Sequence, residues 1–179
     1  MTEYLVRNAD CADVPRVAEM MAEASSWLTS QGSDQWQYPP PVNVIERDVE
    51  ARTLYVVLRE GEVIAAATID RNADPDFWEA GDRPEDALYV HKMAIDRAWA
   101  GRKLGASLLD LAGVLAEEAG LPWVRLDAWK TNERLHRYYQ EEGFDLVRLV
   151  DLEHRQSGAL FQRKATARSS GITLVREGC

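Results

Sequence analysis

The sequence contains few of the residues that build disulfide frameworks, metal centres or membrane spans. It has two cysteines, Cys11 and Cys179, whose separation indicates neither a disulfide framework nor the ligand spacing of a metal site. No apolar run approaches the length of about 20 residues that a membrane helix needs. The chain also does not begin with a basic region followed by an apolar one. We therefore expect a soluble, metal-free protein of the reducing cytoplasm.

Basic residues are scarce compared with acidic ones. The chain has 21 Lys and Arg against 30 Asp and Glu, which gives a formal net charge of −9. Binding to nucleic acid usually requires a basic surface, so this charge argues against such a partner and fits a cationic amine substrate better. With 46% hydrophobic residues, the 179 residues suffice for one well-buried domain and are too few for two.

Hydrophobic periodicity predicts a mixture of helices and strands. Before residue 70 we expect a strand at 4–7, a helix from Asp10 or Asp13 to Glu23, a helix at 42–50, and a hairpin of 54–58 with 63–69. Residues 71–86 contain so many turn formers that we expect a loop, which could cover a site as a lid. Near the C-terminus, strands are expected at 146–152, 160–163 and 172–175.

The most informative segment is an apolar strand that leads through a glycine-containing turn into a helix. The strand Leu88–Ile95 precedes residues 96–109, in which the hydrophobic period lengthens toward that of a helix. Backbone N–H groups in a helix's first turn lack intrahelical partners, and Gly101 and Gly105 would let phosphate oxygens approach them. The basic residues between the glycines add positive charge. Two such glycines are by themselves common turn residues, so a phosphate site needs independent support.

Independent support comes from a second strand and helix further along the chain. The apolar strand Trp123–Trp129 is followed by a segment that matches the pattern Asn-x-x-Ala-x-x-x-Tyr-x-x-x-Gly-Phe at Asn132, Leu135, Tyr139, Gly143 and Phe144. In this pattern the chain resembles the GCN5-related N-acetyltransferases, with a leucine in place of the usual alanine.

The glycine-containing turn resembles the acetyl-CoA signature of the same superfamily. In the Arg-Gly-x-Gly-x-Gly form of that signature, the aligned residues are Ala100, Gly101, Arg102, Lys103, Leu104 and Gly105. Ala100 stands where Arg or Gln is usual, and Lys103 replaces the middle glycine. These departures bear on the affinity for the cofactor and not on the fold.

The resemblance implies a fold, a domain boundary and a cofactor. The implied fold is α/β of the α+β type, with a central, mostly antiparallel mixed sheet of about seven strands, flanking helices, and a splay between the fourth and fifth strands. Residues 1–164 would form a single acetyltransferase domain and residues 165–179 a C-terminal tail. A bulge is expected near Met93. The implied cofactor is acetyl-CoA, contacted by Met93, Ala94, Ile95, Ala100, Gly101, Arg102, Lys103, Leu104, Gly105, Ala106, Asn132 and Tyr139.

Tyr139 and His91 are the candidate catalytic residues. The resemblance implies that Tyr139 faces the departing sulfur, where its phenol would act as a general acid, and a buried structural tyrosine is the alternative. Asn132 would contact the pantetheine arm, cap the helix, or do both. His91 is the candidate general base, because histidine is the side chain whose ordinary pKa lies near neutrality. The sequence slightly favours the alternative of a hydrogen-bonded structural histidine, and a water chain ending on Asp or Glu could replace any histidine as the base.

Substrate recognition is predicted for two loop regions and for the end of the strand at 123–129. The loop regions combine tryptophans with acidic and amide side chains, which could hold a cation. Tryptophans that close the core, and a solvated charged loop, are the alternative interpretations. The candidate substrate-binding residues are Trp27, Asp34, Gln35, Trp36, Trp78, Asp127 and Trp129.

We therefore expect an N-acetyltransferase that moves an acetyl group from acetyl-CoA to a primary amine by direct attack, with Tyr139 as the general acid. A small-molecule acceptor is favoured, such as an amino sugar, polyamine, amino acid or secondary metabolite, because a lid would narrow the site. The alternatives are a protein or peptide amine as acceptor, or a non-catalytic acyl-CoA-binding sensor. The chain could be a monomer or a homodimer, in which the strand at 172–175 pairs with another subunit's edge.

Overall fold

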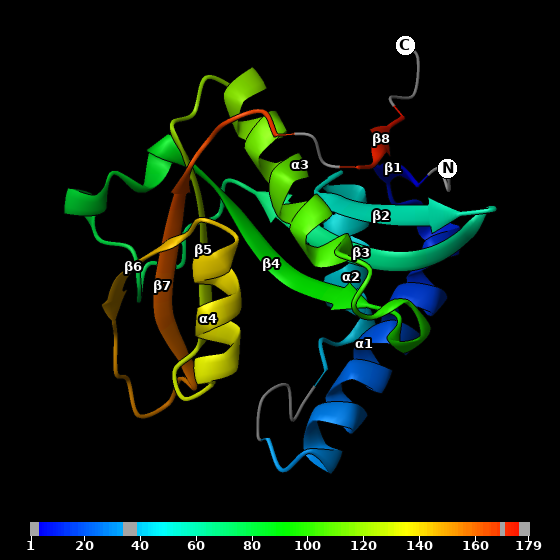
Figure 1. Ribbon diagram of the computed structural model, residues 1–179, viewed down its shortest axis with the longest axis horizontal. Helices are drawn as coiled ribbons and strands as arrows, with labels where there is room; N and C mark the ends of the chain where they lie inside the picture. The colour runs from blue at the N-terminus through cyan, green and yellow to red at the C-terminus, as the bar shows by residue number, and fades with distance from the viewer. Residues whose placement is uncertain (1–3, 34–38, 169–170, 176–179) are drawn as a thin grey trace. The chain divides into compact units, whose positions relative to one another are not determined.

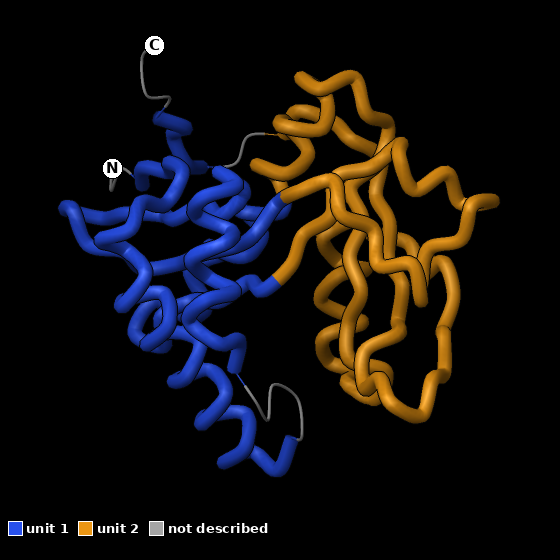
Figure 2. The backbone as a smooth tube through the Cα atoms, turned by 180° about the vertical axis from the view of Figure 1, so that it is seen from behind, with its two compact units in different colours: residues 1–69, 92–109, 169–179 blue, residues 70–91, 110–168 orange. Residues whose placement is uncertain are grey.

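The computed structural model describes residues 4–33, 39–168 and 171–175. In this part of the chain, eight strands form a mixed sheet in the order β6-β7-β5-β4-β3-β2-β1-β8, with helices beside it (Figure 1). The chain divides into two compact units, shown in Figure 2: unit 1 comprises residues 1–69, 92–109 and 169–179, and unit 2 comprises residues 70–91 and 110–168. None of the helices in the described ranges is long and apolar enough to cross a membrane.

Unit 1 includes three antiparallel strands and two helices that share a core. These elements are β1 (Leu5–Asn8), β2 (Leu54–Arg59), β3 (Glu62–Asp70), α1 (Val14–Ser30) and α2 (Val42–Glu50). Period-two alternation in the strands and the apolar stripes of the helices bury one common core, as expected for amphipathic elements. That core includes Val17, Met20, Met21, Ile45, Val49, Leu54, Val56 and Ala66.

The C-terminal strand pairs within the chain. Strand β8 (Thr173–Leu174) lies parallel to β1, with Thr173 opposite Leu5 and Leu174 opposite Val6. The segment that the sequence left free to pair with another subunit is therefore an edge strand of unit 1. It brings the described strands to eight, against the expected number of about seven.

Unit 2 contains β5 (Trp123–Trp129), β6 (Asp145–Leu149), β7 (Ser157–Lys164) and α4 (Glu133–Glu141), and β7 is antiparallel to both other strands. Neighbouring residues of a strand point to opposite faces of the sheet, so the side chains of Leu160 and Phe161 lie on opposite sides of β7. Helix α4 covers the Phe161 side, where Tyr139 contacts that ring. Leu160 belongs to a second core cluster with Phe77, Trp78, Ala87 and Tyr89.

Strand β4 (Ala87–Ile95) has residues in both units. It pairs in parallel with β5 through Ala87–Tyr89, so the splay that the sequence predicted between these strands begins after Tyr89. Lys92 has a φ of 49°, a left-handed conformation that is rare in a strand and typical of β-bulges. It directly precedes Met93, where the sequence predicted a bulge.

Helix boundaries are where the sequence-based predictions were least accurate. Helix α1 was expected to end at Glu23 but continues to Ser30, and the hydroxyls of Thr29 and Ser30 satisfy carbonyls of its last turn. For residues 96–109 the sequence predicted a glycine-containing turn that leads into a helix, without fixing where the helix begins. Residues 97–99 form a short 3-10 helix (Arg97–Trp99), the predicted turn follows, and α3 (Leu104–Glu118) begins after it. Positive φ angles in this turn prevent a continuous helix.

Candidate active site

The turn that leads into α3, residues 100–106, is called the glycine loop below. Gly101 has a φ of 79°, and no atom lies within 4 Å of the position that a Cβ would take. The first hydrogen bond of the helix runs from Ser107 N to Lys103 O, at 3.0 Å. The preceding amides, from Leu104 to Ala106, therefore lie in the turn that lacks intrahelical acceptors. An open helix start of this kind fits the oxygens of a phosphate or pyrophosphate.

Positive charge lies beside the glycine loop, on the ring of Trp99. The guanidinium carbons of Arg59 and Arg102 lie 4.8 and 4.9 Å from the centre of that ring, and Tyr4 packs against it edge-on at 6.3 Å. These residues all belong to unit 1. The cation–π contacts stabilise Arg102 next to amides that could bind an anion.

An ion pair stabilises the bulge of β4 beside residues 93–95. Lys92 Nζ lies 3.0 Å from Asp48 Oδ2 of α2, and the same carboxylate oxygen accepts a hydrogen bond from Thr68 Oγ1 at 2.6 Å. A left-handed conformation costs a residue with a side chain about 1 kcal/mol, which these contacts help to offset. In the segment that follows, Ala94 is buried and its two neighbours are partly exposed.

Asn132 is the N-cap residue of α4. Its Oδ1 accepts a hydrogen bond from Leu135 N at 3.0 Å, which satisfies one of the free donors of the first turn. Trp129 is partly buried, its carbonyl oxygen lies 2.7 Å from His136 Nε2, and the imidazole packs on Phe161. The sequence predicted the cap correctly, and a contact of Asn132 with pantetheine stays a prediction.

Tyr139 lies on the inner face of α4. Its side chain is almost wholly buried, and its ring contacts Tyr138, Phe144 and Phe161. The hydroxyl makes no hydrogen bond to a residue that the structure describes. Burial above all, and then the neighbouring Tyr138 and Asp127, raise the pKa of Tyr139. The phenol therefore keeps its proton at neutral pH, as a general acid must.

His91 is hydrogen-bonded to a carboxylate that the sequence analysis missed. Its Nε2 lies 3.1 Å from Asp70 Oδ1, at the end of β3, and its ring stacks on Tyr89 with a centroid distance of 6.3 Å. Burial raises the pKa of Asp70, but the hydrogen bond and charge of His91, together with bonds from Asn72, outweigh it and lower that pKa. No spacing signal relates two residues 21 positions apart on different strands.

Asp127, a predicted substrate residue, interacts electrostatically with Tyr139. Its negative charge helps to raise the pKa of the Tyr139 phenol, after the larger effects of burial and of Tyr138. Its carboxylate is half-buried on β5, opposite Leu160 of β7. It forms no ion pair or hydrogen bond with any residue in the described part of the chain. A half-buried carboxylate without such a partner suits a cationic ligand.

The other predicted substrate residues of unit 1 have a different setting from the one expected. Trp27 lies on α1 rather than in a turn, and the guanidinium carbon of Arg97 lies 3.7 Å from its ring centre. One face of this ring is therefore occupied by a cation of the protein itself. Asp34, Gln35 and Trp36 lie outside the described residues.

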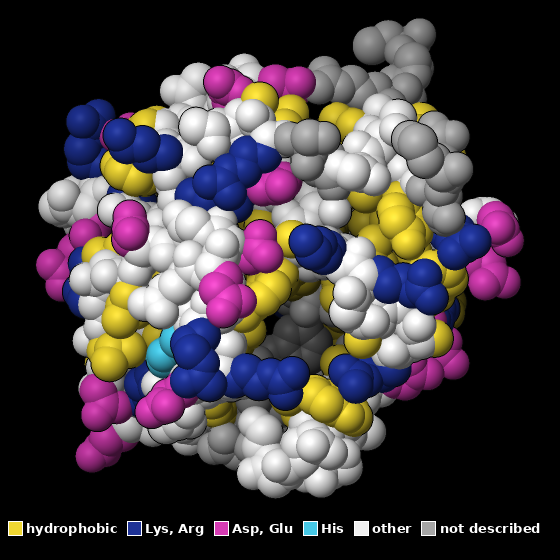
Figure 3. Space-filling view, in the orientation of Figure 1, with side chains coloured by type: hydrophobic (Ala, Val, Ile, Leu, Met, Phe, Trp, Pro, Cys, Tyr) yellow, Lys and Arg dark blue, Asp and Glu magenta, His cyan; other side chains and the backbone are white. Residues whose placement is uncertain are grey.

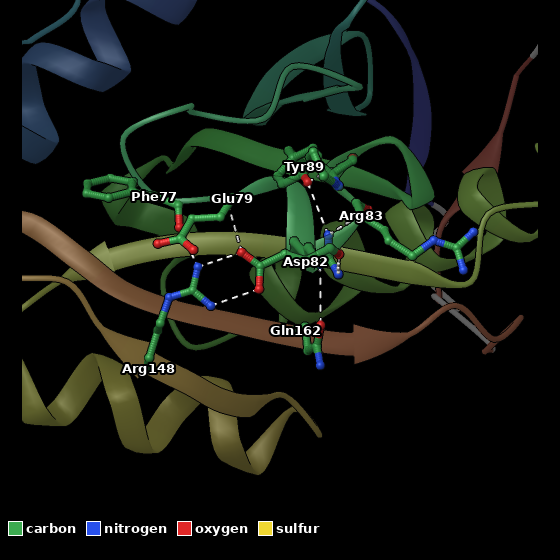
Figure 4. A network of polar contacts seen from close by, with 9 residues as sticks. Phe77, Glu79, Asp82, Arg83, Tyr89, Arg148 and Gln162 are labelled. Carbon is green, nitrogen blue, oxygen red and sulfur yellow. Dashed lines mark hydrogen bonds and ion pairs between the residues drawn. The ribbon is translucent and has the colours of Figure 1, made fainter.

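Residues 71–86, called the acidic loop below, belong to unit 2 and are anchored there by arginines. Arg148 donates to both carboxylate oxygens of Asp82, at 2.8 and 2.6 Å, and to Phe77 O at 2.7 Å (Figure 4). The hydrogen bond from Arg148 is the main cause that lowers the pKa of Asp82 to about 2. Arg155 donates to one carboxylate oxygen of Asp74 and to one of Asp76, both in this loop.

Arg125 is the buried member of this group, with 4% of its surface exposed. It donates to Asp82 O at 2.7 Å, to Arg83 O at 3.2 Å and to Tyr89 Oη at 3.3 Å, and its guanidinium lies over the Trp78 ring at 4.7 Å. Trp78 is 3% exposed. The Trp78 ring therefore packs in the core of unit 2, a position that the sequence did not predict, and it is not accessible to a substrate.

On the side drawn in Figure 3, Lys and Arg side chains are interspersed with Asp and Glu side chains and do not form one basic region. Within residues 4–33, 39–168 and 171–175, no group of three or more His, Cys, Asp and Glu side chains is arranged to hold a metal ion. The candidate catalytic residues Tyr139 and His91 and the candidate substrate residue Asp127 all belong to unit 2.

Similar proteins are found among both sequences and structures. The profile of the Acetyltransferase (GNAT) family matches residues 19–144. A curated relative is the uncharacterized N-acetyltransferase YesJ of Bacillus subtilis (strain 168), which is 26% identical over 165 residues that cover 82% of this chain and 91% of YesJ.

Two solved structures illustrate the shared fold. An acetyltransferase of the GNAT family from Listeria monocytogenes 4b F2365 has a TM-score of 0.77 and 27% identity, with 90% of this chain and 94% of that chain covered. The PaiA N-acetyltransferase from Thermoplasma acidophilum, solved in complex with coenzyme A, has a TM-score of 0.71 and 13% identity over 90% and 99% of the two chains. Since the family profile covers well over half of its residues, the chain belongs to the GNAT family of acetyltransferases.

Proposed function

We propose that this enzyme transfers the acetyl group of acetyl-CoA to the primary amine of a small molecule, by direct attack of the amine on the thioester, with Tyr139 as the general acid. The acceptor class includes amino sugars, polyamines, amino acids and amine-bearing secondary metabolites. A protein or peptide amine is the alternative acceptor.

The open start of α3 is the observation that carries the proposal. Gly101 keeps side-chain atoms away from the loop, and the amides of the first helical turn are available as donors. The coenzyme A complex of the Thermoplasma acidophilum protein gives a precedent for this ligand on a related fold. We assign the pyrophosphate of acetyl-CoA to this loop and its pantetheine arm to the polar backbone of residues 93–95.

The state of Tyr139 supports its assignment as the acid. When the amine attacks the thioester carbonyl carbon, a nitrogen–carbon bond forms and the carbon–sulfur bond breaks. The departing thiolate then needs a proton. The raised pKa of Tyr139 keeps that proton on the phenol until a strong base forms beside it, and its hydroxyl makes no competing hydrogen bond to a described residue. Asp127 is proposed to attract the ammonium form of the acceptor.

The first experiment is to measure free coenzyme A released from acetyl-CoA by the purified protein, with a panel of small amines and acetylatable peptides. Release with a small amine supports the proposal, and release with peptides alone replaces the acceptor class. Tyr139→Phe is expected to lower kcat about 100-fold while acetyl-CoA still binds. If Tyr139→Phe keeps the wild-type kcat with the best acceptor, the acid is misassigned. Binding of acetyl-CoA without any turnover would favour a non-catalytic sensor.

A further inference from the structure

His91 lies at the point where β4 leaves β5. The last paired residue of β4 is Tyr89, opposite Arg125. Strand alternation puts His91 on the face of Tyr89, as their stacked rings confirm, and it puts Asp127 on the face of Arg125. His91 and Asp127 are therefore on the same face of unit 2, each one alternation step beyond the last hydrogen-bonded pair.

Asp70 is held in place independently of His91. Its two carboxylate oxygens accept hydrogen bonds from the backbone N and from Nδ2 of Asn72, at 2.8 and 3.0 Å, and its side chain is 10% exposed. The neighbouring carboxylate, Asp74, is engaged by Arg155 and is no competing partner for the imidazole. The Asp70 carboxylate is thus a fixed acceptor for one nitrogen of His91.

This arrangement determines which nitrogen of His91 carries the proton. An ionised carboxylate can only accept hydrogen bonds, so the contact between Nε2 and Asp70 Oδ1 requires Nε2 to be the donor. In the neutral ring the lone pair then belongs to Nδ1. Nδ1 makes no hydrogen bond to a residue in the described ranges, and the side chain is 23% exposed. The free nitrogen can therefore accept a proton from a ligand.

We propose that His91 Nδ1 is the general base that deprotonates the acceptor ammonium, and that Asp70 is the positioning residue that holds the imidazole in the required tautomer. This inference rests on the proposed function and adds the base that acetyl transfer needs. A carboxylate that fixes a catalytic imidazole by one nitrogen, while the other nitrogen moves the proton, is a known arrangement in unrelated enzymes.

The proton balance of the reaction is then complete. The acceptor nitrogen arrives with three protons and must lose two to become the amide. The first passes to His91 Nδ1 before the nitrogen–carbon bond forms, and from there to solvent. The second leaves as the tetrahedral adduct collapses, and it replaces the phenol proton that Tyr139 gives to the thiolate. One proton is released to solvent for each acetyl group transferred.

The kinetic test compares His91→Gln and Asp70→Asn with the control Asp76→Asn, which removes a half-exposed carboxylate of the acidic loop that pairs with Arg155. With the best acceptor, His91→Gln is expected to lower kcat about 100-fold and Asp70→Asn about tenfold, with KM for both substrates nearly unchanged. Asp76→Asn should keep the wild-type kcat. Circular dichroism and acetyl-CoA calorimetry show whether each variant is folded and loaded.

Nitrogen-15 NMR of the imidazoles tests the positioning role without turnover. In the wild type, Nδ1 of neutral His91 should give the signal of an unprotonated nitrogen. Asp70→Asn should add the other tautomer, because an amide can donate to Nε2. Wild-type kcat in folded His91→Gln overturns the base and leaves the acetyl transfer intact. An unchanged tautomer in Asp70→Asn overturns the positioning role. If no amine yields coenzyme A with the wild type, the proposed function fails and this inference fails with it.

Discussion

Two turn-rich segments of this chain look alike in sequence and differ in structure. The glycine loop and the acidic loop both combine turn formers with charged residues and both flank β4. In the glycine loop, Gly101 and its two neighbours are exposed and the first-turn amides lack intrahelical acceptors. In the acidic loop, arginines of the sheet bind the carboxylates and carbonyls, and Trp78 is buried beneath them.

The difference shows that turn composition alone does not separate a ligand loop from a structural one. The deciding feature is whether other parts of the chain supply partners for the loop's polar groups. Arg125 and Arg148 belong to β5 and β6, and they reach the acidic loop from 43 and 66 positions away. The glycine loop has free donors at a helix start, so its natural partner is an anion.

Removing the buried arginine should have the largest effect on stability. Arg125→Leu deletes the hydrogen bonds that the buried guanidinium donates to Asp82 O, Arg83 O and Tyr89 Oη. We expect the free energy of unfolding, measured by urea titration, to fall by about 3 kcal/mol. The control Arg83→Leu removes a guanidinium that is mostly exposed, and it should change that free energy by less than about 0.5 kcal/mol. Equal effects of both variants would contradict a structural role for Arg125.

Lowering the pH from 3.8 to about 2 should weaken the ion pair between Asp82 and Arg148 in the acidic loop. The pKa of Asp82 is lowered from an ordinary value of 3.8 to about 2, mainly by Arg148. As pH falls, the unfolded state therefore binds the proton first, and the stability contributed by the ion pair is complete above pH 3.8 and lost toward pH 2. The difference in unfolding free energy between wild type and Asp82→Asn should narrow across this window. A constant difference from pH 5 to pH 2 would exclude the ion pair as its cause.

A side chain at position 101 should impair ligand binding. Gly101→Ala introduces a Cβ into a left-handed residue beside the first turn of α3, and we expect the affinity for acetyl-CoA in calorimetry to fall about tenfold. Gly120→Ala is a matched control, because Gly120 also has a positive φ and open surroundings but follows the end of α3. Both variants should lose about 1 kcal/mol of stability. An equal loss of acetyl-CoA affinity in both variants would show that the glycine loop does not bind the ligand.

The smallest effect is expected from the exposed charge of the glycine loop. Arg102→Ala should weaken acetyl-CoA binding about threefold at low salt, and the difference from wild type should shrink as salt rises, because an exposed charge is screened. Arg134→Ala, an exposed arginine on α4, is the control and should bind acetyl-CoA like the wild type. A salt-independent loss in Arg102→Ala would indicate that its stacking on Trp99 matters more than its charge.

The sequence predicted the features that depend on local patterns. Alternation located β2 to β5 within one or two residues, and the order of strand, glycine turn and helix located the start of α3 approximately. The cap by Asn132 followed from residue type alone. The prediction for Trp27 was wrong in its setting, because the seven residues Ala24–Ser30, poor in strong helix formers, still continue α1.

The partners of charged groups could not be predicted in the same way. Asp70 contacts His91, and Asp82 contacts Arg148, only because segments that are far apart in the sequence become neighbours in unit 2. Neither pair has a spacing that distinguishes it from other Asp, His and Arg residues of the chain. The acidic neighbours of Trp78 in the sequence suggested a substrate site. In the structure the ring is buried and contacts Arg125 and Arg148, neither of which is near it in the sequence.

Backbone hydrogen exchange with and without acetyl-CoA tests the contrast between the two loops most directly. We predict that the amides of Leu104, Gly105 and Ala106 exchange rapidly in the free protein and become protected by acetyl-CoA. We also predict that amides of the acidic loop that are already hydrogen-bonded, such as Phe77 and Asp82, exchange at the same rate in both states. Protection of the acidic loop with no change at the start of α3 would contradict the account.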